Sequence, residues 1–185
     1  MLRITGGRFK GISLAAPPKL RATEAKVRQA IGNILGQLLS GARVLDGFAG
    51  SGAFGFEALS RGAAFSAFVD SDPDAVLSIR DNLERLGSEV PRSAWRVLHL
   101  EVEQALAELA RSEPLFDVVF FDPPYRSEEA KKALNAVVQC AILAPAGVVV
   151  VEHPRRTVLP ASVGPLQQFK QHRYGDTVLS FYRST

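Results

Sequence analysis

A short apolar run that ends at an acid and two prolines constrains the fold of this chain more than any other stretch. Residues 117–125 are Asp-Val-Val-Phe-Phe-Asp-Pro-Pro-Tyr, and the apolar part has the length and composition of a strand buried on both faces. Pro123 and Pro124 have no N–H for a sheet ladder, and each keeps the residue before it out of helical geometry. The chain must therefore leave the sheet in a rigid turn, which places Asp122 and Tyr125 where open parallel sheets bind ligands. A purely structural Pro-Pro turn is the alternative interpretation.

Apolar runs alternate with amphipathic stretches along the rest of the chain. The predicted strands are residues 43–48, 65–69, 95–98, 117–121 and 146–151, and the predicted helices are residues 23–39, 56–61, 72–86, 101–111 and 128–139. The tail alternates on both sides of Tyr174-Gly175-Asp176, which is typical of a closing antiparallel hairpin. This order predicts an α/β fold of Rossmann-like type: a mostly parallel seven-stranded sheet with helices on both faces and a C-terminal antiparallel hairpin.

Composition narrows the class of protein. At 185 residues the chain is long enough for one domain with a small appendage. Its single cysteine, Cys140, excludes an intramolecular disulfide and a cysteine-based zinc site, which fits a reducing cytoplasm. No stretch approaches the roughly 18 consecutive apolar residues of a membrane helix, and no cluster of histidines and carboxylates has metal-ligand spacing. We therefore expect a cytoplasmic protein without a membrane segment or a metal.

The positive charge of the chain is concentrated at its start. Residues 1–43 contain eight basic residues and one acidic residue, a net charge of +7, whereas the remaining residues contain 14 basic and 18 acidic residues, a net charge of −4. A basic arm on an acidic body suggests a polyanionic partner such as nucleic acid. A solvated basic face is the alternative.

The basic arm has two predicted parts. Gly6-Gly7 and Gly11 punctuate a short hairpin or ribbon, and Pro17-Pro18 form a stiff linker to a helix that Thr23 is placed to cap. We therefore divide the chain into a nucleic-acid-binding extension, residues 1–40, and a larger domain, residues 41–185. The candidate nucleic-acid contacts are Arg3, Arg8, Lys10, Arg21, Thr23 and Arg28.

A glycine-rich loop follows the first predicted core strand. Gly50, Gly52 and Gly55 match the pattern of a dinucleotide-binding loop, but Asp46 at the end of the strand would repel a pyrophosphate. The same carboxylate suits a ligand that carries an ammonium and a sulfonium group, as S-adenosylmethionine does. The candidate cofactor contacts in this loop are Asp46, Phe48, Gly50, Ser51 and Gly52.

Later polar positions complete the expected cofactor site. Asp70 ends the second predicted strand and can accept hydrogen bonds from both hydroxyls of a ribose, whereas Asp72, directly before Pro73, is typical of a helix N-cap. The Glu101 side chain and the backbone N–H of Val102 could contact the edge of adenine. Glu101 fits equally well as a first-turn acid that the helix dipole stabilises.

These residues together resemble the class I methyltransferases and, more closely, the bacterial family that methylates the exocyclic N2 of one guanine in 16S ribosomal RNA. The resemblance covers nearly the whole chain. It rests on Arg3-Ile4-Thr5-Gly6-Gly7, Leu45-Asp46, Phe48-Ala49-Gly50-Ser51-Gly52, Glu57-Ala58-Leu59-Ser60-Arg61-Gly62 and Asp122-Pro123-Pro124-Tyr125. It implies a class I methyltransferase fold, S-adenosylmethionine as the cofactor, and 16S ribosomal RNA as the partner, within a small-subunit particle or an assembly intermediate.

The resemblance also assigns catalytic roles to the loop after the buried strand. The Asp122 carboxylate and the Pro123 carbonyl would accept hydrogen bonds from the guanine amine, and Tyr125 would stack on the base. Because a sulfonium methyl is already activated, catalysis would consist chiefly of positioning the amine at attack distance.

Other functions remain as alternatives at this point. The same chemistry on adenine N6 or on a protein glutamine amide is the nearest, and the arm argues against it. A nicotinamide-dependent oxidoreductase and a non-catalytic RNA-binding assembly factor are the others. Binding of S-adenosylmethionine without binding of NAD would exclude the oxidoreductase. The intact Asp122–Tyr125 loop argues against the assembly factor.

Overall fold

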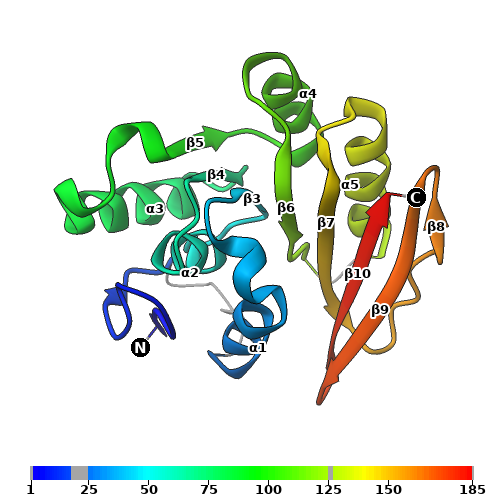
Figure 1. The fold of residues 1–185 in the computed structure, drawn as a ribbon, viewed down its shortest axis with the longest axis horizontal. Coiled ribbons are helices and arrows are strands. Elements are labelled where there is room, and N and C mark those ends of the chain that lie inside the picture. The colour runs from blue at the N-terminus through cyan, green and yellow to red at the C-terminus, as the bar shows by residue number, and fades with distance from the viewer. Residues whose placement is uncertain (1, 18–24, 125–126, 185) are drawn as a thin grey trace.

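An eight-stranded sheet dominates the computed structural model, which describes residues 2–17, 25–124 and 127–184 (Figure 1). In their order across the sheet, the strands are β5 (Trp95–His99), β4 (Phe65–Asp70), β3 (Arg43–Gly47), β6 (Phe116–Phe121), β7 (Leu143–Pro154), β10 (Thr177–Ser184), β9 (Leu166–Tyr174) and β8 (Ser162–Val163). The strands from β5 to β7 are parallel, and the last three are antiparallel to their neighbours. The predicted α/β sheet with a C-terminal hairpin is confirmed. The predicted count of seven strands is wrong, because β8 has two residues and is too short to show an alternating pattern.

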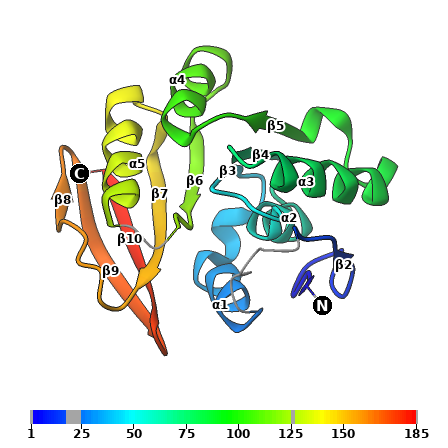
Figure 2. The same cartoon turned by 180° about the vertical axis from the view of Figure 1, so that it is seen from behind.

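Helices cover both faces of this sheet (Figures 1 and 2). They are α1 (Ala25–Leu35), α2 (Ala53–Ser60), α3 (Pro73–Leu86), α4 (Val102–Ser112) and α5 (Ser127–Cys140), with short 3₁₀ turns at Gly36–Leu39, Gly87–Glu89 and Arg92–Ala94. Successive strand residues point to opposite faces. Leu45 and Val119 therefore pack with α4 and α5, whereas Val44 and Phe120 pack with α1 and α2. The α3 helix lies on the α1 side and packs against Phe68.

The bounds of several elements differ from the predicted ones, most clearly at α2 and β7. The α2 helix begins at Ala53, directly after Gly52, whose φ of 75° ends the loop. Gly55 therefore belongs to the helix, where a Cβ would lie 2.3 Å from an atom of the Phe68 ring, so that glycine serves close helix–sheet packing. The β7 strand is longer than predicted because it pairs with β10 as far as Pro154, opposite Thr177.

The start of the chain forms the predicted ribbon and packs onto the rest of the protein. Strands β1 (Leu2–Arg3) and β2 (Ser13–Leu14) pair antiparallel. Glu57 of α2, which is 1% exposed, accepts hydrogen bonds from the Thr5 backbone N–H at 2.7 Å and from the Thr5 hydroxyl at 2.8 Å. The α1 helix buries Val27 and Ile31 in the core of the sheet. Packing is thus continuous across residue 40, and a separate function for residues 1–40 stays a prediction.

Two further findings on the described residues concern membrane or metal binding and the single cysteine. These residues contain neither a helix with the length and apolarity of a membrane span nor a group of three His, Cys, Asp or Glu side chains that could hold a metal ion. Cys140 is a half-buried free thiol at the end of α5.

Candidate active site

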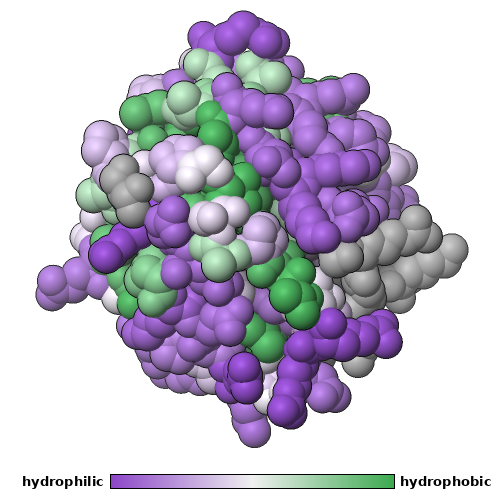
Figure 3. All heavy atoms as spheres, turned by 90° about the vertical axis from the view of Figure 1, so that its right-hand side faces the viewer, coloured by the Kyte–Doolittle hydropathy of each residue, from purple (hydrophilic) through white to green (hydrophobic). Residues whose placement is uncertain are grey.

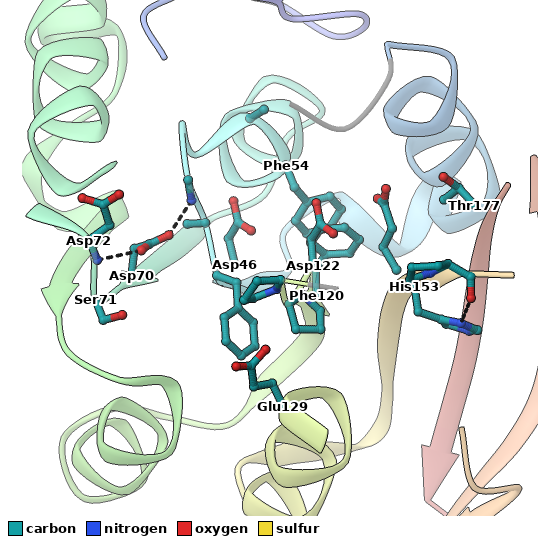
Figure 4. A pocket seen from close by; sticks show the side chains of 18 of the residues that line it. Asp46, Phe54, Asp70, Ser71, Asp72, Phe120, Asp122, Glu129, His153 and Thr177 are labelled. Carbon is teal, nitrogen blue, oxygen red and sulfur yellow. Dashed lines mark hydrogen bonds between the residues drawn. The ribbon is translucent and has the colours of Figure 1, made fainter. Parts of the chain in front are cut away.

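A cleft of about 1240 Å³ opens at the carboxyl ends of the parallel strands. Its walls come from the ends of β3, β4, β6 and β7, the segments after them, and the start of β10 (Figure 4). The predicted site residues that line it are Asp46, Phe48, Gly50, Ser51, Asp70, Glu101, Asp122 and Pro123. The fold therefore brings most of the predicted cofactor and catalytic residues into one cavity.

The glycine-rich loop after β3 is a tightly wound turn. Phe48 has a φ of 59°, which is uncommon for a residue with a side chain, and Gly50 and Gly52 have φ values of 56° and 75°. The Phe48 ring contacts the edge of the Phe121 ring at a centroid distance of 6.1 Å. The Ser51 carbonyl accepts a hydrogen bond from the Asn82 side chain of α3 at 3.3 Å. These contacts fix the loop against the sheet and against α3.

Asp46 is a buried carboxylate at the end of β3. It is 2% exposed, and its Oδ2 atom accepts a hydrogen bond from the Gly55 N–H at 2.8 Å. Burial raises the pKa of Asp46 well above its ordinary value, the hydrogen bond from Gly55 opposes that shift, and the carboxylates of Asp122 and Asp70 add to it. A cationic ligand in the cleft would stabilise the ionised form of this side chain.

Asp70 organises the neighbouring strand end. Its Oδ2 atom accepts a hydrogen bond from the Gly50 N–H at 2.7 Å, and its Oδ1 atom accepts one from the Asp72 N–H at 2.9 Å. Burial is the main cause that raises the pKa of Asp70, and these backbone donors oppose the shift. Each carboxylate oxygen can accept a further hydrogen bond, as from a ribose hydroxyl. Asp72 caps α3 by accepting from the Asp74 N–H at 2.9 Å, which confirms the predicted cap.

The predicted adenine contacts lie at the start of α4. Glu101 is exposed, lines the cleft and precedes the helix, but its side chain makes no hydrogen bond to the helix N-terminus. Val102 is 2% exposed and packs in the core. Its backbone N–H belongs to the first helical turn, where N–H groups have no partner within the helix. The absence of a cap makes Glu101 available to a ligand, and adenine recognition stays a prediction.

The Asp122 loop follows β6 beside the Asp46 end of β3. Asp46 lies opposite Phe120 in the parallel register, so Asp122 extends past the sheet on the same face as Asp46. Below it, the Phe120 and Phe54 rings stack at a centroid distance of 4.3 Å and form an apolar floor. Pro123 is buried and lines the cleft. Tyr125 lies outside the described residues.

The predicted site residues did not include the wall that β7 and β10 provide. Glu152, His153, Arg155, Arg156, Asp176 and Thr177 line the cleft there. Figure 4 places His153 and Thr177 on the opposite side of Asp122 from Asp70 and Asp72. His153 is 5% exposed, with Nε2 2.8 Å from the Ser180 hydroxyl and Nδ1 3.0 Å from the Pro154 carbonyl oxygen. Burial lowers the pKa of His153, which favours its neutral form. The signal in the sequence was a polar run at the end of a buried strand, at the same sheet edge as Asp122.

Five of the six candidate RNA contacts lie either on the exposed ribbon or outside the described residues. Arg3 and Lys10 are exposed on the ribbon, whereas Arg8 is paired with Glu89 at 3.6 Å. Arg21 and Thr23 lie outside the described residues. These five stay predictions.

The prediction that Arg28 contacts RNA is wrong for the conformation described. Arg28 is 3% exposed, and its guanidinium donates to the Arg3 carbonyl at 3.2 Å. Burial lowers the pKa of Arg28, and the nearby carboxylates of Glu57 and Glu152 oppose that shift. The helical turn that carries Arg28 presents it to the interior, so it joins the ribbon to the domain instead of facing a ligand.

Proteins that are named as methyltransferases are similar to this chain over most of its length. A model of the family described as Conserved hypothetical protein 95 matches residues 2–183. A Bacillus subtilis protein with the name "Putative rRNA methyltransferase YlbH" is 38% identical over 184 residues, which cover 98% of each chain. Ribosomal RNA small subunit methyltransferase D of Escherichia coli K12 is 34% identical over 161 residues, which cover 86% of this chain and 78% of that protein.

A solved structure agrees with these relatives. The structure described as "Putative methyltransferase yhhF from Escherichia coli" superposes with a TM-score of 0.84 at 30% identity, over 98% of this chain and 97% of that one. The chain therefore has the class I methyltransferase fold and belongs to the Conserved hypothetical protein 95 family, the family of ribosomal RNA small subunit methyltransferase D.

Proposed function

We propose that this protein transfers a methyl group from S-adenosylmethionine to the exocyclic N2 of a guanine in 16S ribosomal RNA. The observation that carries the proposal is the position of Asp122-Pro123 at the cleft, beside the acidic strand ends of β3 and β4. Family membership supports the reaction class, since the relatives are named as ribosomal RNA methyltransferases.

The acidic side of the cleft suits S-adenosylmethionine. This cofactor supplies an activated methyl group on a sulfonium, and it also carries an ammonium, so both of its cationic groups favour a carboxylate-lined site. Asp46 would face the methionine part of the cofactor, and the backbone of Gly50 to Gly52 would lie close to the same part. Asp70 would accept hydrogen bonds from the ribose hydroxyls. Glu101 and Val102 would lie at the adenine end. Hydrogen bonds from Gly50 and Asp72 already hold the Asp70 carboxylate in place.

The Asp122 loop supplies the acceptors for the amine. The lone pair of the guanine amine is delocalised into the ring, so the nitrogen is a poor nucleophile unless it is held in a favourable orientation. If Asp122 and the Pro123 carbonyl accept hydrogen bonds from its two N–H groups, the lone pair faces the methyl carbon at a near-attack distance of roughly 3–3.5 Å. Methyl transfer would then form the nitrogen–carbon bond as the carbon–sulfur bond of S-adenosylmethionine breaks, and the proton of the nitrogen would be lost to solvent or to Asp122. The products are N2-methylguanine and S-adenosylhomocysteine.

The RNA partner and its context belong to the same proposal. The exposed Arg3 and Lys10 on the ribbon would bind RNA phosphates, with Arg8, Arg21 and Thr23 as further candidates. We propose that the substrate is 16S ribosomal RNA in a small-subunit particle or an assembly intermediate, in the cytoplasm. Membership of a methyltransferase family argues against an oxidoreductase and against a non-catalytic assembly factor.

Ribosomal RNA from a strain that lacks this gene provides the test. Nucleoside mass spectrometry of its small-subunit RNA should show the loss of one N2-methylguanine relative to the parent strain. The purified protein should restore that nucleoside in vitro when S-adenosylmethionine is present. An unchanged N2-methylguanine content, or the loss of a methyladenine instead, would contradict the proposal.

A further inference from the structure

Positive charge is concentrated at both ends of the chain. Residues 153–185 contain five basic residues and one acidic residue, a net charge of +4, whereas residues 44–152 contain nine basic and 17 acidic residues, a net charge of −8. The five basic residues are Arg155, Arg156, Lys170, Arg173 and Arg183. The basic N-terminal arm therefore has a counterpart in the segment that builds the β7–β10 wall of the cleft.

The charged side chains that line the cleft are unevenly distributed. The side formed by the ends of β3, β4 and β5 carries five carboxylates, which are Asp46, Asp70, Asp72, Glu101 and Glu103. The β7–β10 side carries Arg155 and Arg156 together with Glu152 and Asp176, and α5 adds Glu129 and Lys132 to the lining. A polyanion is repelled by the first side more strongly than by the second, where Arg155 and Arg156 are exposed, so the β7–β10 side is the more favourable path for an RNA strand that reaches Asp122.

Three carboxylates also line this part of the cleft. Glu152 is 8% exposed and interacts electrostatically with the buried Arg28. Glu129 is half-buried on α5. Asp176 lies in the turn between β9 and β10, and its backbone carbonyl accepts a hydrogen bond from the Arg155 N–H at 2.8 Å. This side therefore has exposed guanidinium groups at its rim, whereas Glu152 is buried and interacts with the cationic Arg28.

Arg155 and Arg156 are carried by a well-defined turn. Pro154 pairs with Thr177, and the Thr157 N–H donates to the Pro154 carbonyl at 2.9 Å. Both arginine residues are exposed, and within the described residues neither forms an ion pair. By contrast, Arg61 is paired with Glu57 at 2.8 Å. Two guanidinium groups on a fixed turn can bind phosphate with little reorganisation of the backbone.

We propose that Arg155 and Arg156 form a phosphate-binding rim for the RNA strand beside the target nucleotide, on the opposite wall of the cleft from the cofactor. The inference rests on the proposed function and adds a second RNA contact, separate from the N-terminal ribbon. The RNA backbone passes over the rim while the target base enters the cleft toward Asp122. Phosphate contacts of this kind position the RNA without reading its sequence.

The outer edge of the same hairpin offers a matched control. Figure 3 shows this face of the molecule, where a band of hydrophobic residues lies between hydrophilic ones. Phe169 is 43% exposed on β9, and the Arg183 guanidinium lies 5.0 Å from its ring centroid. Lys170 and Arg183 thus carry the same charge as Arg155 and Arg156, but they do not line the cleft.

The experiment compares three double variants of the full chain with the wild type on small-subunit ribosomal RNA, supplied both as a transcript and within small-subunit particles from the strain that lacks this gene. Arg155→Gln with Arg156→Gln should weaken RNA binding and reduce the slope of log affinity against log salt concentration by about 1.4–1.8, since two phosphate contacts are lost. Lys170→Gln with Arg183→Gln should leave the slope unchanged. Arg155→Lys with Arg156→Lys keeps the charges and should retain the wild-type slope. Cofactor affinity, measured by titration calorimetry, should be the same in all of them and reports that each variant is folded.

The outcomes separate this inference from the proposed function. If the wild-type protein transfers no methyl group to the RNA, the proposed function fails. If the wild type is active and the Arg155/Arg156 variant keeps its salt slope, the rim is not a phosphate site. An equal reduction of the slope in both glutamine variants would also overturn the inference, because the effect would then depend on net charge alone.

Discussion

The two walls of the cleft hold their polar groups in different ways. On the wall formed by the ends of β3 and β4, which is the proposed cofactor wall, Asp46 and Asp70 accept hydrogen bonds from the backbone N–H groups of Gly55, Gly50 and Asp72. On the β7–β10 wall, the exposed guanidinium groups form no ion pair within the described residues. The first wall is preorganised for a small ligand of fixed shape. The second presents charge at a rim, which suits a large and flexible polyanion.

This difference between the walls predicts two kinds of effect for substitutions. A change on the cofactor wall should alter cofactor affinity and stability, because those carboxylates also satisfy backbone donors. A change on the opposite wall or on the ribbon should alter RNA affinity and its salt dependence, because those charges face solvent. Asp122 lies between the walls, so its removal should affect the chemical step and leave cofactor binding intact.

The largest expected effect is therefore at Asp122. Asp122→Ala removes the proposed acceptor for the amine and should reduce the single-turnover methylation rate on the order of 10²–10³-fold, by analogy with the loss of a preorganised oxyanion-hole donor. Asp122→Asn should lose less, because an amide oxygen still accepts a hydrogen bond without the charge-assisted part. Rapid-quench assays at saturating cofactor measure both. Complete inactivity of both variants with cofactor binding intact would indicate an obligatory negative charge or a general base. An Ala variant as fast as the wild type would exclude Asp122 from the mechanism.

On the cofactor wall, Asp70→Ala should weaken S-adenosylmethionine binding by roughly 1–3 kcal/mol, the cost of leaving polar partners without hydrogen bonds. Titration calorimetry gives this value directly. Asp72→Ala is the matched control, since it also removes one carboxylate from the cleft, together with the cap of α3. It should cost about 1 kcal/mol of stability with little change in cofactor affinity. Equal losses of affinity in both variants would mean that Asp70 acts through the loop and not through the ribose.

On the ribbon, the combination of Arg3→Gln and Lys10→Gln should reduce the salt slope of RNA binding by about 0.7–0.9 for each phosphate contact that is lost. Arg28→Met provides the contrast, because Arg28 is buried beside Glu57 and Glu152. It should lower the free energy of unfolding and leave the salt slope of the folded protein unchanged. A reduced slope in Arg28→Met with unchanged stability would show that Arg28 reaches the RNA after all.

The smallest effect is expected at Asp46, as a pH dependence of stability. Burial raises the pKa of Asp46, so between its ordinary and its raised pKa the folded protein binds more protons than the unfolded chain. The contribution of this residue to the free energy of unfolding therefore falls as pH rises through that window. Asp46→Asn does not titrate, and its amide oxygen can still accept from Gly55. It should be more stable than the wild type at neutral pH, and the advantage should vanish near pH 4, the ordinary value for Asp.

Urea denaturation at several pH values measures this difference. Saturating S-adenosylmethionine should reduce it, because a cationic ligand stabilises the ionised carboxylate of the wild type. An Asn variant that is less stable at every pH, by a constant amount, would show that the Asp46 carboxylate is stabilised by other groups in the folded protein.

The sequence by itself determined the features that depend on neighbouring residues. Asp72 before Pro73 predicts a helix cap, because a short polar side chain and a fixed φ angle favour that geometry in any context. The exit from the sheet after Phe121 follows from the missing N–H of two prolines. The α/β class of the fold follows from the alternation of apolar runs with amphipathic stretches, and family resemblance adds the expected role of the Asp122 loop.

Only the tertiary structure decided what depends on distant partners. Arg28 has the sequence context of a basic surface residue, yet the Arg3 carbonyl, Glu57 and Glu152 surround it once α1 packs on the sheet. Gly55 lies in α2 and not in the loop, and at that place the Phe68 ring leaves no room for a side chain. The β7–β10 wall exists because β10 pairs with β7 beyond the core and brings the turn at Asp176 next to Arg155. Local propensity cannot encode such contacts, since burial and charge at one residue are set by elements that are distant in the chain.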